Sequence, residues 1–543
     1  MAPPVLRKIA AELGLPTIVH APRDLHLIFL TRFLRMAGYG GIALVLALFF
    51  AALSVSDERI GLFMTLTLLG DVALSLFLTL VADSLGRRRV LQLGCAGMVV
   101  AGAVFGLASG YWVLLAAAVV GVISVSGNEI GPFRAVEESA LAGLVPGSAA
   151  RSEVFAWYVV VGTLGSAVGL LGAGWVVEAC KRREGWVELD AFRVVFWGYG
   201  AVGAVKAGLT MLLSERCEVD GYAAAAAAPA AGAGRGEYRA VGSGDGGPGG
   251  RKDTAAEDAE ESERDVFLTP SRSSEEGAAN DDDDDTNERP LPPTPPQPAP
   301  PPKPKMGFAQ LSTPTRWMLL KLCALFCVDS LASGMVPYSL INFYLDRKFG
   351  LPKSTLGAIV AATWVTSSVG NVFAAAIAKR IGLVRTMVFT HLPSAVFLAL
   401  IPAPNVVWLT AVLLVARGTL ASMDQAPRSA FLSMVVRPEE RTAVMGIVNV
   451  VKTLSQSGGP SVTGLLAGGN RFWIAFVVAG AMKAAYDCGL LTLFVKVEKK
   501  AEGAIKLDQR ETRDLVDEFE LDTDDEAFDS GDDTPGKRRD SAA

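Results

Sequence analysis

The fold is decided by one short stretch, LVADSLGRRRVLQLG (Leu80 to Gly94), in which Asp83, Gly86 and three consecutive arginines separate two long apolar runs. Of the 543 residues, 51% are hydrophobic, while the formal net charge is only -6. Apolar runs of about 20 residues recur along the chain, and this is the length that an α-helix needs to cross a bilayer. The sequence therefore predicts a polytopic membrane protein, with this stretch as a polar loop between two spans.

The apolar runs predict twelve transmembrane helices, at residues 27–53, 60–81, 89–109, 112–133, 153–177, 192–214, 317–343, 356–377, 384–401, 406–430, 442–467 and 472–495. They divide the chain into an N-terminal segment (1–26), a six-helix bundle (27–214), a linker (215–316), a second six-helix bundle (317–495) and a tail (496–543). The linker is acidic and proline-rich and the tail is acidic, so both have too little apolar surface to fold. We expect both to be disordered in the cytosol, as simple connecting segments; the alternative is that they bind other proteins.

The short loops show an alternation of charge that indicates their side of the membrane. Basic residues gather in every second loop, among them Arg87, Arg151, Arg385 and Arg437. Loops rich in arginine and lysine stay in the cytosol. Both termini are therefore expected in the cytosol, and the plasma membrane and the vacuolar membrane are both open as locations.

The two halves of the chain repeat each other. Three glycines of the first half recur at a constant offset of 296 residues, Gly38, Gly61 and Gly86 being matched by Gly334, Gly357 and Gly382. A second match pairs GAVKA with GAMKA, which places Lys206 and Lys483 at equivalent points in the last span of each half. Equal span counts and shared loop positions predict two pseudo-symmetric bundles of six helices.

The loop ADSLGRRRVL, between the second and third spans, resembles the signature loop of the major facilitator superfamily, although Thr79 and Ser84 stand where the family has a glycine and a basic residue. The segments GNEIGPFRAVEES, MDQAPRSAF and VNVVKTLSQSGGP resemble fungal members of that superfamily whose substrate is unassigned. The resemblance implies an all-α integral membrane fold of twelve helices in two pseudo-symmetric six-helix bundles. It also implies a secondary active transporter that works by alternating access.

Two groups of residues are expected to form a cytosolic gate. The resemblance assigns the first group to the signature loop, where charges lock the cytosolic face, namely Asp83, Gly86, Arg87, Arg88 and Arg89. The second group is an apparent repeat pair in which an acid is followed by an arginine within five residues, namely Glu129 with Arg134 and Asp424 with Arg428. The simpler alternative for the loop charges is topological anchoring.

Five charged residues lie deep within predicted spans: Arg35, Asp71, Asp329, Arg417 and Lys452. A charge at the centre of a membrane helix costs about 2.5 to 3.5 kcal/mol on insertion scales, so it is kept for a reason. We expect these five to face the cavity between the halves and to bind substrate or ions. The alternative is that they form buried ion pairs that only fix the register of the helices.

Other polar residues in the spans can be explained by local pairing or packing, without a role in substrate binding. Lys483 and Asp487 are four residues apart on one helix face and are expected to satisfy each other. Lys206 has no acidic residue at that spacing, so the role of Lys206 is left undecided. His391 is expected to be a hydrogen-bonded packing residue rather than a proton carrier.

The sequence carries no nucleotide-binding loop, no catalytic constellation and no metal-ligand spacing among its six cysteines. We therefore expect no enzyme activity, cofactor, metal or nucleic-acid partner. Two deep acids, Asp71 and Asp329, suggest the hypothesis of proton coupling, and three deep basic residues slightly favour an anion over other small polar substrates. The alternative is a membrane sensor or scaffold that transports nothing and recruits cytosolic proteins.

Overall fold

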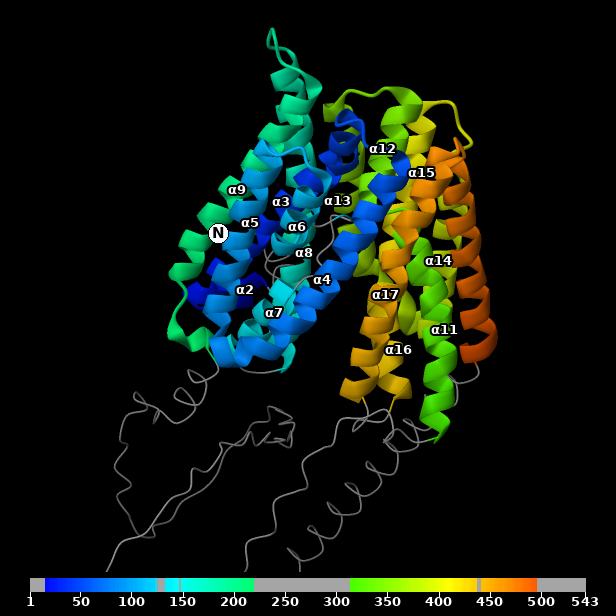
Figure 1. The fold of residues 1–543 in the computed structure, drawn as a ribbon. Coiled ribbons are helices and arrows are strands. Elements are labelled where there is room, and N and C mark those ends of the chain that lie inside the picture. The colour runs from blue at the N-terminus through cyan, green and yellow to red at the C-terminus, as the bar shows by residue number, and fades with distance from the viewer. Residues whose placement is uncertain are drawn as a thin grey trace, which may run out of the picture. The chain divides into compact units, whose positions relative to one another are not determined.

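The computed structural model describes residues 15–123, 125, 132–145, 148–218, 313–436 and 441–495, and all regular structure within these ranges is helical (Figure 1). The expected linker and tail, with any cytosolic partners, lie outside the described residues, apart from the few linker residues at 215–218 and 313–316. Glu129 and the side chain of Asp83 also lie outside them.

The first half contains the helices α2 (Leu15–Val19), α3 (Arg23–Ala52), α4 (Asp57–Leu85), α5 (Arg87–Leu107), α6 (Tyr111–Val120), α7 (Pro132–Leu144), α8 (Ser148–Lys181) and α9 (Glu188–Met211), followed by the 3-10 turn η1 (Glu215–Cys217). The second half contains α11 (Thr313–Met335), α12 (Tyr338–Phe349), α13 (Lys353–Ile381), α14 (Leu383–Leu400), α15 (Val407–Ser422), α16 (Gln425–Val435), α17 (Arg441–Gly468) and a final helix, Phe472–Val495. Nine helices of the described chain are long and apolar enough to cross a membrane.

Most expected spans coincide with a single helix. Three of them correspond to a pair of shorter helices instead: the fourth to α6 and α7, the seventh to α11 and α12, and the tenth to α15 and α16. The break in the seventh span has a local cause. Pro337 precedes α12 in an extended conformation, and proline has no backbone N–H with which to continue the hydrogen bonds of α11. The helix α7 likewise begins at Pro132, at a position that proline favours.

The glycine repeat marks one tight turn that occurs in each half. Gly86 precedes α5 with φ +90°, and Gly382 precedes α14 with φ +94°. Glycine alone adopts such angles without a steric penalty. At the first turn, the Glu218 carboxylate accepts hydrogen bonds from the backbone N–H groups of Arg87 (2.6 Å) and Arg88 (3.0 Å). The side chain of Glu218 therefore satisfies the exposed N-terminus of α5.

The most extensive contacts between the two halves are those of three helix pairs, α4 with α17, α8 with α13 and α3 with α12. Figure 1 shows α4 and α17 side by side. Two of the contacts lie at the helix ends farthest from the glycine turns: Arg347 donates to both carboxylate oxygens of Asp57 (2.8 and 3.2 Å), and the Lys353 backbone N–H donates to Glu178 (2.7 Å). The structure is therefore closed at the ends opposite the signature loop.

Gly61 lets α4 approach α17 closely on the closed side. A Cβ atom at this position would lie 2.4 Å from the Pro460 carbonyl oxygen and 2.8 Å from the Gly464 Cα. We predict that Gly61→Ala costs about 1–3 kcal/mol in the closed arrangement, because both neighbours are backbone atoms that cannot move aside. The measurement is disulfide formation between Thr65→Cys and Ser461→Cys, whose native hydroxyl oxygens are 2.8 Å apart, after the six natural cysteines have been replaced.

The cross-linking rate should fall about tenfold in Gly61→Ala, which corresponds to about 1.4 kcal/mol. The matched control is Gly172→Ala, because a Cβ at Gly172 meets no atom within 4 Å. Equal cross-linking in the two variants would show that the close approach of α4 and α17 does not need a glycine.

Candidate functional site

The structure places the five deep charged residues in different surroundings. All five lie on helices of the described chain, Arg35 on α3, Asp71 on α4, Asp329 on α11, Arg417 on α15 and Lys452 on α17. Arg35 and Asp329 each belong to a separate cluster of buried charges. Arg417 and Lys452 have no carboxylate close enough for an ion pair in the part of the chain that the structure describes. The five do not form one continuous group.

The N-half cluster consists of Arg32, Arg35, Glu137, Tyr158 and Lys206. Arg35 and Glu137 are 0% and 1% exposed, and Arg35 donates to both oxygens of the Glu137 carboxylate, one of them at 2.7 Å. The Tyr158 hydroxyl donates to the same carboxylate (2.8 Å), and the Lys206 ammonium lies 4.0 Å from it. A single carboxylate thus holds charged groups from α3 and α9 against α7.

Aromatic rings complete the surroundings of these cations. The Phe133 ring lies 5.0 Å from the Arg35 guanidinium and 4.2 Å from the Lys206 ammonium, measured to the ring centroid. The Arg32 guanidinium lies 3.7 Å from the centroid of the Tyr158 ring. Such contacts stabilise a cation most strongly where water is excluded.

Glu137 was missed in the sequence because the fourth span was expected to end at residue 133. In the structure that span breaks, and its second piece, α7, carries the glutamate into the core. A signal was present: the buried residues of α7 follow a helical spacing, namely Phe133, Val136, Glu137, Ala140 and Leu141. Glu137 occupies the apolar face, whereas its neighbour Glu138 pairs with the exposed Arg134 (2.7 Å).

Asp71 and Arg35 have a common neighbour, Tyr199. Asp71 is buried on α4, and both Asp71 and Arg35 are near enough to the Tyr199 hydroxyl to act on it electrostatically. That hydroxyl donates to the Gly121 carbonyl oxygen (2.9 Å), and the Tyr199 ring stacks on Tyr39. Tyr199 is therefore a shared neighbour of the deep acid of α4 and the arginine of α3.

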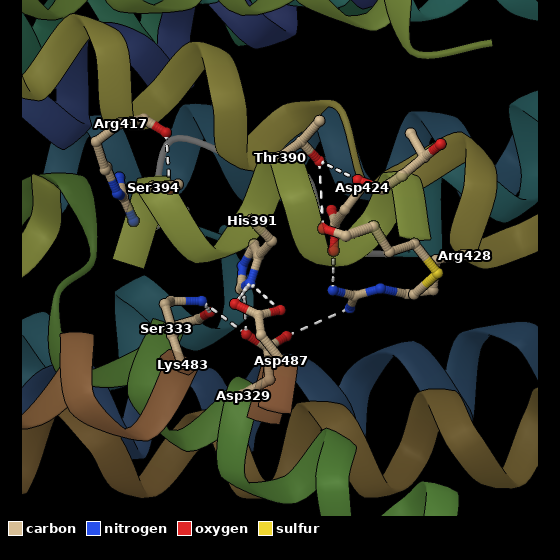
Figure 2. Close-up of polar contacts among 12 residues, drawn as sticks. Asp329, Ser333, Thr390, His391, Ser394, Arg417, Asp424, Arg428, Lys483 and Asp487 are labelled. Atoms are coloured by element: carbon tan, nitrogen blue, oxygen red, sulfur yellow. Dashed lines mark hydrogen bonds and ion pairs between the residues drawn. The ribbon is translucent and has the colours of Figure 1, made fainter. Parts of the chain in front are cut away.

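The C-half cluster consists of Asp329, His391, Asp424, Arg428, Lys483 and Asp487 (Figure 2). Lys483 donates to Asp329 (2.7 Å) and to the Ser333 hydroxyl (2.7 Å). Arg428 donates to the other Asp329 oxygen (3.3 Å) and to Asp424. Asp329 is therefore held by cations from two helices, α16 and the final helix.

His391 occupies the other side of this cluster. Its Nδ1 atom lies 3.0 Å from both carboxylate oxygens of Asp487, and its Nε2 atom lies 3.7 Å from Asp329. Lys483 was expected to pair with Asp487, but in the structure it binds Asp329 and Ser333. The histidine takes the place of the expected lysine as the partner of Asp487.

Arg417 and Lys452 are the deep cations of the second half that stand outside an ion pair, among the described residues. Arg417 is only 9% exposed, and its guanidinium lies 5.9 Å from the ring centroid of Tyr338, an uncharged residue at the start of α12. The Lys452 ammonium lies 5.5 Å from the Phe326 ring centroid.

The expected gate residues fall at three places. Gly86, Arg87 and Arg88 form the turn that Glu218 binds, and Arg89 is exposed beside it. Arg134 is exposed on α7. Asp424 and Arg428 pair with each other and, through Arg428, with Asp329. A role of these residues as a gate stays a prediction.

The adjacent residues Glu137 and Glu138 give a matched test of the N-half cluster. Glu137→Gln removes the buried carboxylate that Arg35 and Lys206 share, so we predict a loss of about 3–5 kcal/mol in the free energy of unfolding. Glu138→Gln removes only an exposed pair on the same helix and should cost no more than about 0.5 kcal/mol. Denaturant unfolding of the purified protein in detergent measures both, and equal losses would contradict a special role for Glu137.

Comparison with known proteins agrees with this architecture. The family model described as Major Facilitator Superfamily matches residues 28–238 and 322–521. An uncharacterized membrane protein of Saccharomyces cerevisiae is 33% identical over 482 residues, which cover 88% of this chain and 96% of the relative. The cis,cis-muconate transport protein of Acinetobacter baylyi is 29% identical over 155 residues, 28% of this chain and 37% of the relative.

Solved transporter structures share the fold at low sequence identity. The nucleoside transporter NupG superposes with a TM-score of 0.58 at 10% identity, over 87% of this chain and 100% of that chain. A D-xylose-proton symporter superposes with a TM-score of 0.55 at 12% identity, over 86% and 95% of the two chains. This chain is a multi-pass membrane protein that belongs to the major facilitator superfamily.

Proposed function

We propose that this protein is a secondary active transporter that carries a small organic anion across its membrane by alternating access. Membership of the major facilitator superfamily supports the transport function and the rocking of two six-helix bundles. The single observation that carries the anion preference is Arg417, a buried arginine on α15 that lies outside any ion pair in the described part of the chain.

The cost of burying a charge explains why Arg417 favours an anion. A cation in the membrane interior is retained either because a carboxylate neutralises it or because a ligand does. Arg35 is neutralised by Glu137, whereas Arg417 and Lys452 each lie near an aromatic ring and form no ion pair with a described residue. A guanidinium binds a carboxylate through two parallel hydrogen bonds, which makes Arg417 the stronger candidate contact.

The neighbours of Arg417 suggest the shape of the anion. Tyr338 lies next to the buried Trp364, with ring centroids 5.3 Å apart and an interplanar angle of 37°. A cation beside one ring of an aromatic pair suits a flat carboxylate. The Acinetobacter relative, a cis,cis-muconate transport protein, supports the same class of substrate.

The buried clusters have a different role in this proposal. Arg35 and Asp329, expected as ligands, fasten helices within their own half through Glu137 and through Lys483 and Arg428. Each half then moves as a rigid body. The signature-loop residues Asp83, Gly86, Arg87, Arg88 and Arg89 close the opposite, cytosolic side in the other conformation, together with Arg134, and both termini lie on that side.

A proton gradient is proposed as the driving force. Asp71 and Asp329 are the deep acids that suggested it, and Asp329 belongs to a cluster of three acids and three cationic or titratable side chains. A cluster of this composition can change its proton content when the arrangement of its partners changes.

Uptake into proteoliposomes tests the proposed substrate class. With an inward proton gradient, the wild-type protein should accumulate radiolabelled cis,cis-muconate, used as a probe for flat dicarboxylates. We predict that Arg417→Gln lowers uptake by at least about 100-fold, because a charged hydrogen bond to a buried carboxylate contributes about 3 kcal/mol. Arg417→Lys should keep part of the activity, since it restores the charge without the two parallel donors.

The matched control is Arg471→Gln, which removes an exposed arginine at the start of the final helix and should leave uptake unchanged. If Arg417→Gln retained uptake while the wild type transported the probe, Arg417 would not be the anion contact. If the wild type accumulated neutral or cationic solutes and no carboxylate, the anion proposal would fail.

A further inference from the structure

The pair formed by His391 and Asp487 is the part of the C-half cluster that the ion pairs do not explain. Asp487 is 0% exposed, and its recorded side-chain partner among the described residues is the Nδ1 atom of His391, 3.0 Å from both oxygens. One proton must lie between these atoms, since a buried carboxylate and a ring nitrogen that both lack a proton would repel each other. The opposite ring nitrogen, Nε2, faces the Asp329 carboxylate at 3.7 Å.

The balance of charges around the histidine favours the binding of one more proton. Asp329 and Asp424 are matched by Lys483 and Arg428, which bind them directly. Asp487 then has only the imidazole as a counter-group in the described chain. A neutral imidazole leaves Asp487 as an uncompensated buried anion, whereas an imidazolium neutralises it and presents a second N–H to Asp329.

The groups that face this pair come from every helix packed around it. They are Asp487, Lys483 and Tyr486 on the final helix, Asp329 on α11, Asp424 and Arg428 at α16, and Lys452 on α17, which acts on the cluster electrostatically. The other two histidines of the chain, His20 and His26, lie outside this cluster, near the start of the described chain. His391 is thus the member of the cluster whose ordinary titration range falls near neutral pH.

We propose that His391 Nε2 is the proton-binding atom of this transporter and that the His391–Asp487 pair, rather than Asp71 or Asp329, carries the coupled proton. This inference rests on the proposed proton-coupled transport. In the step, Nε2 takes up one proton from water on the side to which the site is open, while the proton between Nδ1 and Asp487 stays in place. The pair changes from a net charge of minus one to zero.

Lys483 supplies the alternative arrangement that releases the proton. It precedes Asp487 by four residues on one helix, a spacing at which two side chains can meet, but it now binds Asp329 and Ser333. If Lys483 moves from Asp329 to Asp487, the ammonium neutralises Asp487 and the imidazolium is no longer needed. The structure shows Lys483 bound to Asp329, and the spacing of four residues permits a second arrangement in which it binds Asp487.

A short path connects this proton site with the proposed anion contact. Ser394 lies three residues after His391 on α14, and its hydroxyl donates to the Arg417 backbone carbonyl oxygen (2.9 Å; Figure 2). A shift of α14 that accompanies protonation of His391 would move α15 at Arg417. The geometry thus provides physical contact between the two sites, without a shared side chain.

The first half of the molecule offers no equivalent within its described residues. Glu137 is surrounded by Arg35 and Lys206 and accepts from Tyr158, so its negative charge is already compensated. The matching lysines Lys206 and Lys483 thus have different neighbours: one adjoins a fixed ion pair, the other a histidine. The proposed proton step therefore belongs to the second half alone.

Histidine-selective nuclear magnetic resonance tests the proton site without any substrate. In the variant His20→Asn/His26→Asn, His391 is the remaining histidine, and its ¹⁵N signals report the proton on each ring nitrogen. We expect Nε2 to gain a proton as the sample is brought from alkaline to acidic pH, and we expect Asp487→Asn to change the pH dependence of the Nε2 signal. A ring that stays neutral, or stays charged, over the whole range would overturn the proposal.

Transport measurements separate coupling from binding. His391→Asn keeps an N–H donor for Asp487 but cannot take up a proton, so we expect exchange of cis,cis-muconate across the membrane to persist while accumulation driven by a pH gradient is lost. His20→Asn/His26→Asn is the matched control and should accumulate the probe as the wild type does. Gradient-driven accumulation in His391→Asn equal to that of the wild type would overturn the proposal. A wild type that transports no muconate would instead count against the proposed substrate, and the resonance experiment would still decide the proton site.

Discussion

The cost of an ionised side chain inside the membrane is the constraint on which the rest of this structure depends. A lone charge there costs several kcal/mol, and attraction to a partner offsets that cost only when the geometry is good. Arg35 and Asp329 meet the condition with partners on other helices of their own half. Arg417 and Lys452 lie near aromatic rings and form no ion pair among the described residues, and this difference separates the residues that hold the bundles together from those proposed to bind the anion.

In each half a buried ion pair joins the first and the fourth span, but the acid and the arginine have exchanged places. In the first half, the arginine is on the first helix (Arg35) and the acid is on the fourth (Glu137). In the second half, the acid is on the first helix (Asp329) and the arginine is on the fourth (Arg428). The lysine of the last helix keeps its place in both. An ion pair fastens two helices whichever helix carries the acid, so the repeat could conserve the connection while the individual residues diverged.

Much of the fold followed from the sequence because the period and length of apolar runs depend only on the bilayer. The loop at Gly86 and its copy at Gly382 were also predictable, since a positive φ demands glycine in both. The breaks within three spans were not, because helix propensity alone does not say whether a proline ends a helix or bends it. That error hid Glu137, which a continuous fourth span would have left outside the membrane.

The partners of the deep charges were less predictable, for a physical reason. Spacing along one helix identifies residues that can meet, such as Lys483 and Asp487, but it carries no information about neighbouring helices. In the structure, contacts from α11, α14 and α16 compete for the same groups, and Lys483 binds Asp329 instead. The local rule identified a possible arrangement, and the tertiary packing determined which one is present.

Strong and weak ion pairs are distributed in a way that suits a rocking motion. The pairs within each half are buried, and removing one partner of such a pair typically costs about 3–5 kcal/mol. The pairs between the halves lie at helix ends: Arg347, which binds Asp57, is 49% exposed, and Lys353 of α13 reaches the half-exposed Glu188 of α9 at 3.3 Å. Exposed pairs contribute only about 0–1 kcal/mol and can be replaced by water. In the proposed alternating-access cycle, opening the closed side breaks these weaker pairs and leaves the buried pairs of each bundle intact, so that each bundle moves as a body and the deep cations face one side at a time.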